Sequence, residues 1–169
     1  MDFNTIMTYM SQYGILFLIV IVFLEYLNLP GFPAGVILPV TGILIASSEM
    51  NFWIALIASS LSALAASWAF YFVGRYGGDF LLQKYMKRFP KHRPYIEKKM
   101  LYLKEKGSIG VFISKLIPMA RTIIAIPAGA VQINFLKYTV SSALGILIWN
   151  VFFIAAGYFF GQEIVHLIK

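Results

Sequence analysis

The chain has 169 residues, of which 60% are apolar and 12% are charged, whereas soluble domains average about 45–50% apolar and about 25% charged. This composition excludes an ordinary soluble enzyme and predicts a single small integral membrane domain. The chain contains no cysteine, which excludes disulfides and thiolate metal sites. Residues 1–13 carry no Lys or Arg, so we expect a short interfacial helix there and not a signal peptide.

The segment 14–48 is apolar but interrupted in the middle. Its two apolar runs, 14–24 and 36–46, have 11 residues each and flank the sequence EYLNLPGFPAG. As a helix, 11 residues extend about 16 Å, about half of a hydrocarbon core of about 30 Å. The segment therefore predicts a re-entrant hairpin broken at Pro30 and Pro33. Two short, tilted full spans over residues 14–29 and 34–48 are the alternative.

The next segments predict a membrane span and a charged linker. The apolar run 52–73 predicts a transmembrane helix over residues 52–74. Ten of the fourteen Lys and Arg then fall in the linker 75–107, which the positive-inside rule places in the cytoplasm. Its apolar residues at helical spacing predict amphipathic surface helices broken at Pro90 and Pro94. We expect the linker to attract anionic lipids and not nucleic acid, because membrane segments flank it.

The second half of the chain repeats the pattern of the first. Segment 108–131 contains two short apolar runs around KLIPMAR and predicts a second re-entrant hairpin, and the run 135–160 predicts a transmembrane helix over residues 135–161. A shift of 83 residues superimposes several residues of the two halves: Asn51 and Asn134, Ser59 and Ser142, Gly74 and Gly157, Gly35 and Pro118. We therefore predict an all-α membrane protein built as an inverted repeat, each half a re-entrant hairpin followed by a transmembrane helix.

Three charged residues lie inside the apolar segments: Glu25, Lys115 and Arg121. A charge at the bilayer centre costs about 2.5–3.5 kcal/mol, so such residues are functional candidates. Pro118 turns the chain between the two cations, which would let both bind one anion. Arg121 also begins a half-helix, whose free N–H groups would favour a phosphate. A structural ion pair with Glu25 is the alternative, although one carboxylate cannot neutralise two cations.

Other polar and aromatic residues receive weaker assignments. Arg75 is expected to be a cytoplasmic anchor and, as a second possibility, to guard a vestibule. Tyr71 is expected in an interfacial aromatic belt, and Ser67 on a small-residue face that packs helices together. Glu163 and His166 alone fall short of a metal site, and no cofactor is expected.

Several blocks together resemble the DedA family, which shares its domain with the eukaryotic VTT lipid scramblases. These blocks are Glu25 followed by Pro30 and Pro33, FYFVGRYGG (70–78), FISKLIPMARTIIAIPAG (112–129), and Asn150 after Trp149. The resemblance implies a multi-pass protein of the bacterial cytoplasmic membrane that moves lipids such as undecaprenyl phosphate or phosphatidylethanolamine between leaflets.

Carried over from the family, its two hairpin arginines fall on Lys115 and Arg121, and its first hairpin acid falls on Glu25. This chain departs from the family in two ways. Lys115 keeps the charge of an arginine but lacks its bidentate fork. A second acid is missing near Gly35, which argues against a proton-coupled mechanism that needs two carboxylates.

We therefore predict a lipid translocator in which Lys115 and Arg121 bind the headgroup phosphate and Glu25 is their counter-charge. An ion- or proton-coupled small-solute transporter that uses the same charges is the alternative. A lipid-phosphate-processing enzyme is disfavoured because no histidine lies near these charges to act as a base or nucleophile. A structural protein without cargo leaves the cations unexplained, and the oligomeric state, a homodimer included, stays open.

Overall fold

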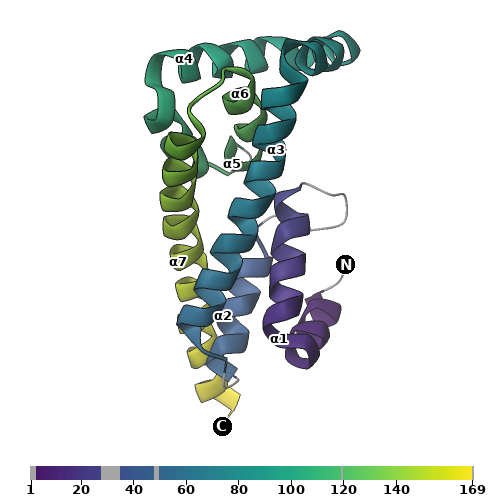
Figure 1. The fold of residues 1–169 in the computed structure, drawn as a ribbon. Coiled ribbons are helices and arrows are strands. Elements are labelled where there is room, and N and C mark those ends of the chain that lie inside the picture. Colours follow the sequence, from purple (N-terminus) through teal and green to yellow (C-terminus); the bar gives the residue numbers. More distant parts are fainter. Residues whose placement is uncertain (1–2, 28–34, 48–49, 119, 169) are drawn as a thin grey trace. The chain divides into compact units, whose positions relative to one another are not determined.

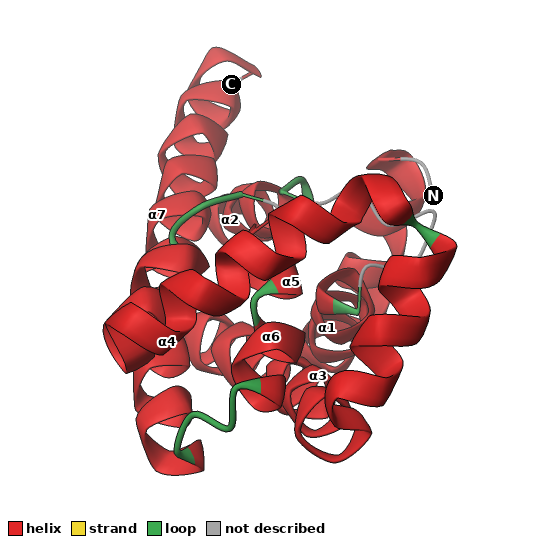
Figure 2. Ribbon diagram, turned by 90° about the horizontal axis from the view of Figure 1, so that it is seen from above, coloured by secondary structure: helices red, strands yellow, loops and turns green. Residues whose placement is uncertain are grey.

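The computed structural model describes residues 3–27, 35–47, 50–118 and 120–168, and all regular structure within these ranges is helical (Figures 1 and 2). The predicted all-α class is therefore confirmed for the described part of the chain. Two compact units divide the chain. The first comprises residues 1–63 and 147–169, and the second comprises residues 64–146.

The first unit holds two shorter helices and one end of each long helix. These are α1 (Phe3–Tyr26), α2 (Ile37–Ser47), the beginning of α3 (Phe52–Arg88) and the end of α7 (Phe135–Ile168). α1 packs against α2 and is kinked at Gly14 (φ 55°, ψ −130°), a conformation that glycine adopts readily. Ser62 of α3 donates a hydrogen bond of 2.5 Å to the Ile19 carbonyl of α1. The kink separates residues 3–13 from the apolar arm that follows.

The second unit holds the remaining parts of α3 and α7 and the elements between them. These are a 3₁₀ helix η1 (Pro90–His92), α4 (Arg93–Lys115), α5 (Ala120–Ile123) and α6 (Ala125–Ala130). α4 contacts α5 and α6, lies above them in Figure 2, and is kinked at Gly107 (φ 55°, ψ −131°). The buried core of the second unit consists of Tyr71, Leu103, Val111, Ile124, Ala125, Ala128 and Tyr138. The predicted break between two linker helices lies here: α3 ends at Arg88, η1 follows, and Pro94 lies in the first turn of α4, where its missing N–H costs no helical hydrogen bond.

The two long helices contain the predicted membrane spans. α3 and α7 each include an apolar section of 27 residues, Phe52–Gly78 and Phe135–Gly161. Each section is about 40 Å long and can cross a hydrocarbon core. Large apolar side chains on these sections are exposed, among them Trp53 (67%), Leu136 (71%) and Phe152 (67%), as expected for helices surrounded by lipid. The prediction of two long apolar helices is therefore confirmed.

The starts of the two spans are capped in the same way. Asn51 Oδ1 accepts hydrogen bonds from the backbone N–H groups of residues 53 and 54 at the start of α3. Asn134 Oδ1 accepts them from residues 136 and 137 at the start of α7. An asparagine in the N-cap position satisfies N–H groups that have no partner within the helix. The predicted 83-residue relation thus recurs in the geometry of the two caps.

Close glycine contacts also recur in the two units. A Cβ at Gly42 would overlap the Ile154 carbonyl of α7, and a Cβ at Gly129 would overlap the Tyr71 carbonyl of α3. Likewise, Gly157 lies against the Pro39 carbonyl, and Gly74 lies against the Ile126 carbonyl. In both pairs the long-helix positions differ by 83 and the short-helix positions by 87. Glycines therefore let a short helix approach a long helix at backbone distance within each unit.

Candidate functional site

Lys115 ends α4 inside the second unit, where its side chain is 1% exposed. Its Nζ donates a hydrogen bond of 2.7 Å to the hydroxyl of Ser67 in α3. Gly145 of α7 makes room for it, because a Cβ at that position would lie 2.5 Å from the Lys115 Cβ. Lys115 is therefore buried within the second unit.

Arg121 follows the Pro118 turn in the same unit and is 4% exposed. Lys115 and Arg121 are therefore both buried in the same unit. The expected free N–H groups at this half-helix are contradicted. The Ala120 N–H donates to the Pro118 carbonyl at 2.8 Å, and the Arg121 N–H donates to the Ile117 carbonyl at 3.1 Å. α5 has only four residues, and the turn at its start already uses these two N–H donors, so they do not form an anion site.

Glu25 lies near the end of α1 in the first unit and is 2% exposed. Its Oε1 accepts a hydrogen bond of 3.1 Å from the backbone N–H of Gly35, whose φ is 86°. The carboxylate therefore joins the end of α1 to the residues that precede α2. Pro30 and Pro33 lie outside the described residues. The counter-charge role of Glu25 toward the cations of the second unit stays a prediction.

Arg75 lies on the exposed surface of α3 and contacts a buried tyrosine. Its Nη1 donates a hydrogen bond of 2.7 Å to the hydroxyl of Tyr71, which in turn donates one to the Ile133 carbonyl. The Tyr71 ring stacks on that of Tyr138 with centroids 4.4 Å apart. Tyr71 is 0% exposed, so its assignment to an interfacial belt is wrong. Arg75 instead reaches the core of the second unit through this tyrosine.

Asn150 is a fully buried amide of α7 in the first unit. Its Nδ2 donates hydrogen bonds of 3.2 Å to the hydroxyls of Ser59 and Ser60 in α3. Buried amides between membrane helices are commonly paired in this way. Asn150 thus connects the two long helices within the first unit.

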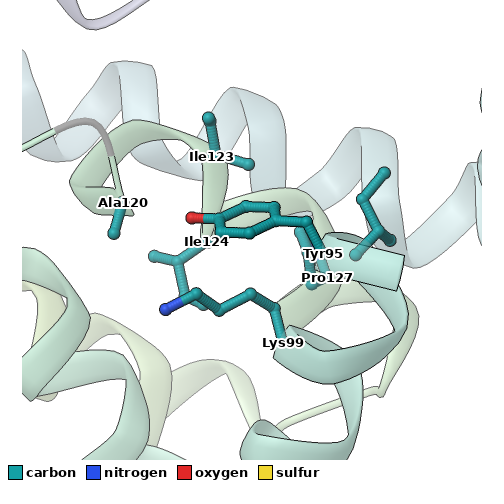
Figure 3. Close-up of a pocket in the computed structure, with 7 residues that line it drawn as sticks. Tyr95, Lys99, Ala120, Ile123, Ile124 and Pro127 are labelled. Carbon is teal, nitrogen blue, oxygen red and sulfur yellow. The ribbon is translucent and has the colours of Figure 1, made fainter. Parts of the chain in front are cut away.

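α4 covers one side of the segment that carries Arg121. Tyr95 and Lys99 extend along that segment, with their polar ends directed toward Ala120 (Figure 3). Lys99 Nζ lies 5.6 Å from the centroid of the Tyr95 ring, a cation–π distance. The cavity enclosed here measures about 10 Å³, room for about one water molecule. A lipid headgroup therefore does not fit into this cavity.

Comparison with known proteins assigns the chain to a family. The family model described as the VTT domain matches residues 15–159. The chain belongs to the VTT domain family. This domain covers both units and contains Glu25, Lys115 and Arg121. Among the residues that the structure describes, no three His, Cys, Asp or Glu side chains form a group that could hold a metal ion.

The chain is also similar to curated bacterial proteins. Undecaprenyl phosphate transporter A of Bacillus subtilis (strain 168) is 30% identical over 131 residues, which cover 78% of this chain and 66% of the transporter. Protein DedA of Escherichia coli (strain K12) is 25% identical over 151 residues, 88% of this chain and 68% of that protein. Inner membrane protein YabI of Escherichia coli (strain K12) is 24% identical over 160 residues, 93% of this chain and 62% of that protein. No solved structure matches the chain.

Sequence reasoning missed the residues that surround Lys115. Ser67 was assigned to helix packing, and Gly145 was not singled out. One usable signal was present, because the shift of 83 residues that pairs Ser59 with Ser142 also pairs Ser67 with Asn150. Both residues of that second pair lie in long helices, are polar and buried, and form side-chain hydrogen bonds. Matched polar positions in the two spans therefore mark buried polar contacts of the VTT domain.

Proposed function

We propose that the protein moves a phosphate-bearing lipid, such as undecaprenyl phosphate or phosphatidylethanolamine, from one leaflet of the bacterial cytoplasmic membrane to the other. The observation that carries the proposal is the burial of Lys115 and Arg121 in one unit. Lys115 forms its hydrogen bond with a neutral hydroxyl, which positions the ammonium group without neutralising it. A buried cation of this kind, with a second one in the same unit, favours an anionic ligand.

The proposed architecture is an inverted repeat of two re-entrant hairpins, with the linker 75–107 in the cytoplasm. The matched asparagine caps and the matched glycine contacts support a repeat. Gly14 and Gly107, which precede the first arm of each hairpin, also share a kink with nearly identical dihedral angles. The short apolar helices Tyr13–Tyr26, Ile37–Ala46 and Ala120–Ala130 are consistent with hairpins that return to their own side. Repeats of this type commonly hold a substrate near the bilayer midplane.

In the proposed mechanism, the side chains of Lys115 and Arg121 bind the headgroup phosphate while the acyl or prenyl tail stays in the bilayer. Glu25 is the counter-charge of the empty state. The breaks at Pro30, Pro33 and Pro118 let the hairpins open a polar path. Motion of one hairpin and its span against the other would expose the headgroup to each leaflet in turn.

Replacement of Arg121 by Ala tests the proposal. The purified variant is reconstituted into liposomes that contain a fluorescent phospholipid, and translocation is followed by quenching of the outer leaflet. We expect the rate to fall to that of protein-free liposomes, with insertion unchanged. Arg88→Ala, which removes an exposed cation of the linker, is the matched control and should keep the wild-type rate. Wild-type translocation by R121A would remove the central residue of the proposal.

A second candidate function is coupled transport of an ion or small solute, which the buried carboxylate of Glu25 favours. The same liposomes, loaded with a pH-sensitive dye and measured without a lipid probe, separate the two candidates. Proton flux that depends on Arg121 in the absence of lipid movement would favour this second function over lipid translocation.

A further inference from the structure

A larger hollow of about 480 Å³ lies in the second unit, at the kink of α4 and the start of α7. It is lined by residues 103–109 of α4, by Val131, Ile133 and Asn134, and by Lys137 of α7. Neither Lys115 nor Arg121 belongs to its lining. The hollow is therefore separate from the site to which the proposed function refers, and nothing above assigns it a ligand.

The charge of the lining is positive. Lys104, Lys106 and Lys137 contribute three ammonium groups, and Glu105 contributes the single carboxylate. All four side chains are exposed, and among the described residues none of them forms a salt bridge with another. Lysine side chains held around a concave surface attract a phosphate as point charges. The expected ligand is thus an anion with room around it for a group larger than phosphate alone.

Apolar residues border the hollow where the membrane sections of the unit begin. Ile109, which lines the hollow just beyond the Gly107 kink, is 64% exposed, and Leu136, which precedes Lys137, is 71% exposed. Cationic and apolar surfaces therefore meet at one place, as they do where a headgroup and an acyl chain are bound together. A free anion in water would gain no binding energy from contact with these exposed apolar residues.

We propose that this hollow binds the headgroup of an anionic phospholipid from the leaflet next to the basic linker. Lys104 and Lys106 contact the phosphate from α4, Lys137 contacts it from α7, and the acyl chains lie along Ile109 and Leu136. The ligand is a resident lipid and not the translocated one. The bound lipid joins the Gly107 kink of α4 to the first turn of the long helix α7.

The test is titration of the full-length protein in detergent with phosphatidylglycerol, followed by native mass spectrometry. The triple variant Lys104→Gln, Lys106→Gln, Lys137→Gln should bind phosphatidylglycerol at least about tenfold more weakly than the wild type, because it removes all three cations of the lining. The matched control, Lys84→Gln, Lys87→Gln, Lys91→Gln, removes the same charge from exposed residues outside the lining. It should bind within about twofold of the wild type in detergent, where no membrane surface attracts the linker as a whole.

Equal loss in both triple variants, or no loss in the first, would overturn the proposal. Inorganic phosphate that displaces phosphatidylglycerol at comparable concentration would also overturn it, because the site would then take a free anion. Lys137→Gln alone should weaken binding in part, and it carries the test if the triple variant fails to fold. Both triple variants keep Lys115 and Arg121, so a difference between them reports on the hollow even if the translocation proposal fails.

Discussion

The Nζ of Lys115 donates a hydrogen bond of 2.7 Å to the hydroxyl of Ser67, and both residues are buried in the second unit. A buried ammonium group is costly unless polar atoms replace its water shell. An ammonium carries three N–H donors, so one hydroxyl fixes its place and leaves donor capacity for an anion. Ser67 is thus the residue that positions one of the two cations of the candidate site.

Replacement of Ser67 by Ala should destabilise the protein and slow translocation. The loss of a hydrogen-bond partner for a buried charged group costs about 1.5–3 kcal/mol. Thermal unfolding in detergent measures the first effect and the liposome assay the second. Ser141→Ala, which removes a half-buried hydroxyl from α7, is the control and should leave both values near those of the wild type. Wild-type stability of S67A would show that the ammonium group does not depend on Ser67.

Gly145→Ala should displace the Lys115 side chain. The new Cβ would lie 2.5 Å from the Lys115 Cβ and 3.2 Å from the Phe112 carbonyl oxygen, so neither neighbour can avoid it by moving a flexible side-chain end. Overpacking of this kind costs about 1–3 kcal/mol in the free energy of unfolding. We expect a lower melting temperature and slower translocation, whereas Leu144→Ala on the exposed side of the same helix should change neither. An unaltered G145A variant would contradict the tight packing around Lys115.

The spans and their starts follow from the sequence because they depend on local properties. Hydropathy and length determine which segments can cross a bilayer, and both long helices contain the expected apolar sections. Asn51 and Asn134 precede apolar runs, and both are found as caps. The break between α3 and α4 is also local, because proline disrupts a helix interior but is tolerated in the first turn, where Pro94 lies.

The contacts of the candidate site were harder to predict because they join distant residues. The Ser67 hydroxyl and the Gly145 backbone meet Lys115 from two other helices, and only the fold specifies that meeting. The burial of Tyr71 likewise depends on its stacking with Tyr138, 67 residues later in the chain. The sequence predicts a helix start at Arg121, with N–H groups free to bind an anion. In the structure, the N–H groups of Ala120 and Arg121 instead donate to carbonyls of the preceding turn.

Glu25→Gln separates the structural role of the residue from its charge. The amide oxygen of glutamine can still accept the Gly35 N–H, so we expect stability within about 1 kcal/mol of the wild type. Translocation should fall if the negative charge balances the cations. Glu25→Ala loses the hydrogen bond as well and should lower the free energy of unfolding by about 1–3 kcal/mol. Full translocation by E25Q, measured in liposomes, would leave Glu25 as a structural residue only.

The matched glycines test whether the two units use one packing scheme. A Cβ at Gly42 would meet the Tyr158 nitrogen at 2.5 Å, and a Cβ at Gly129 would meet the Arg75 nitrogen at 2.7 Å, in addition to the carbonyl oxygens that both overlap. Backbone cannot move aside as a side chain does, so Gly42→Ala and Gly129→Ala should each destabilise the protein by about 1–3 kcal/mol. Ala69→Leu, which adds bulk at an exposed position of α3, is the control. Thermal unfolding in detergent measures all three, and a large loss for one glycine with none for the other would contradict equivalent roles in a repeat.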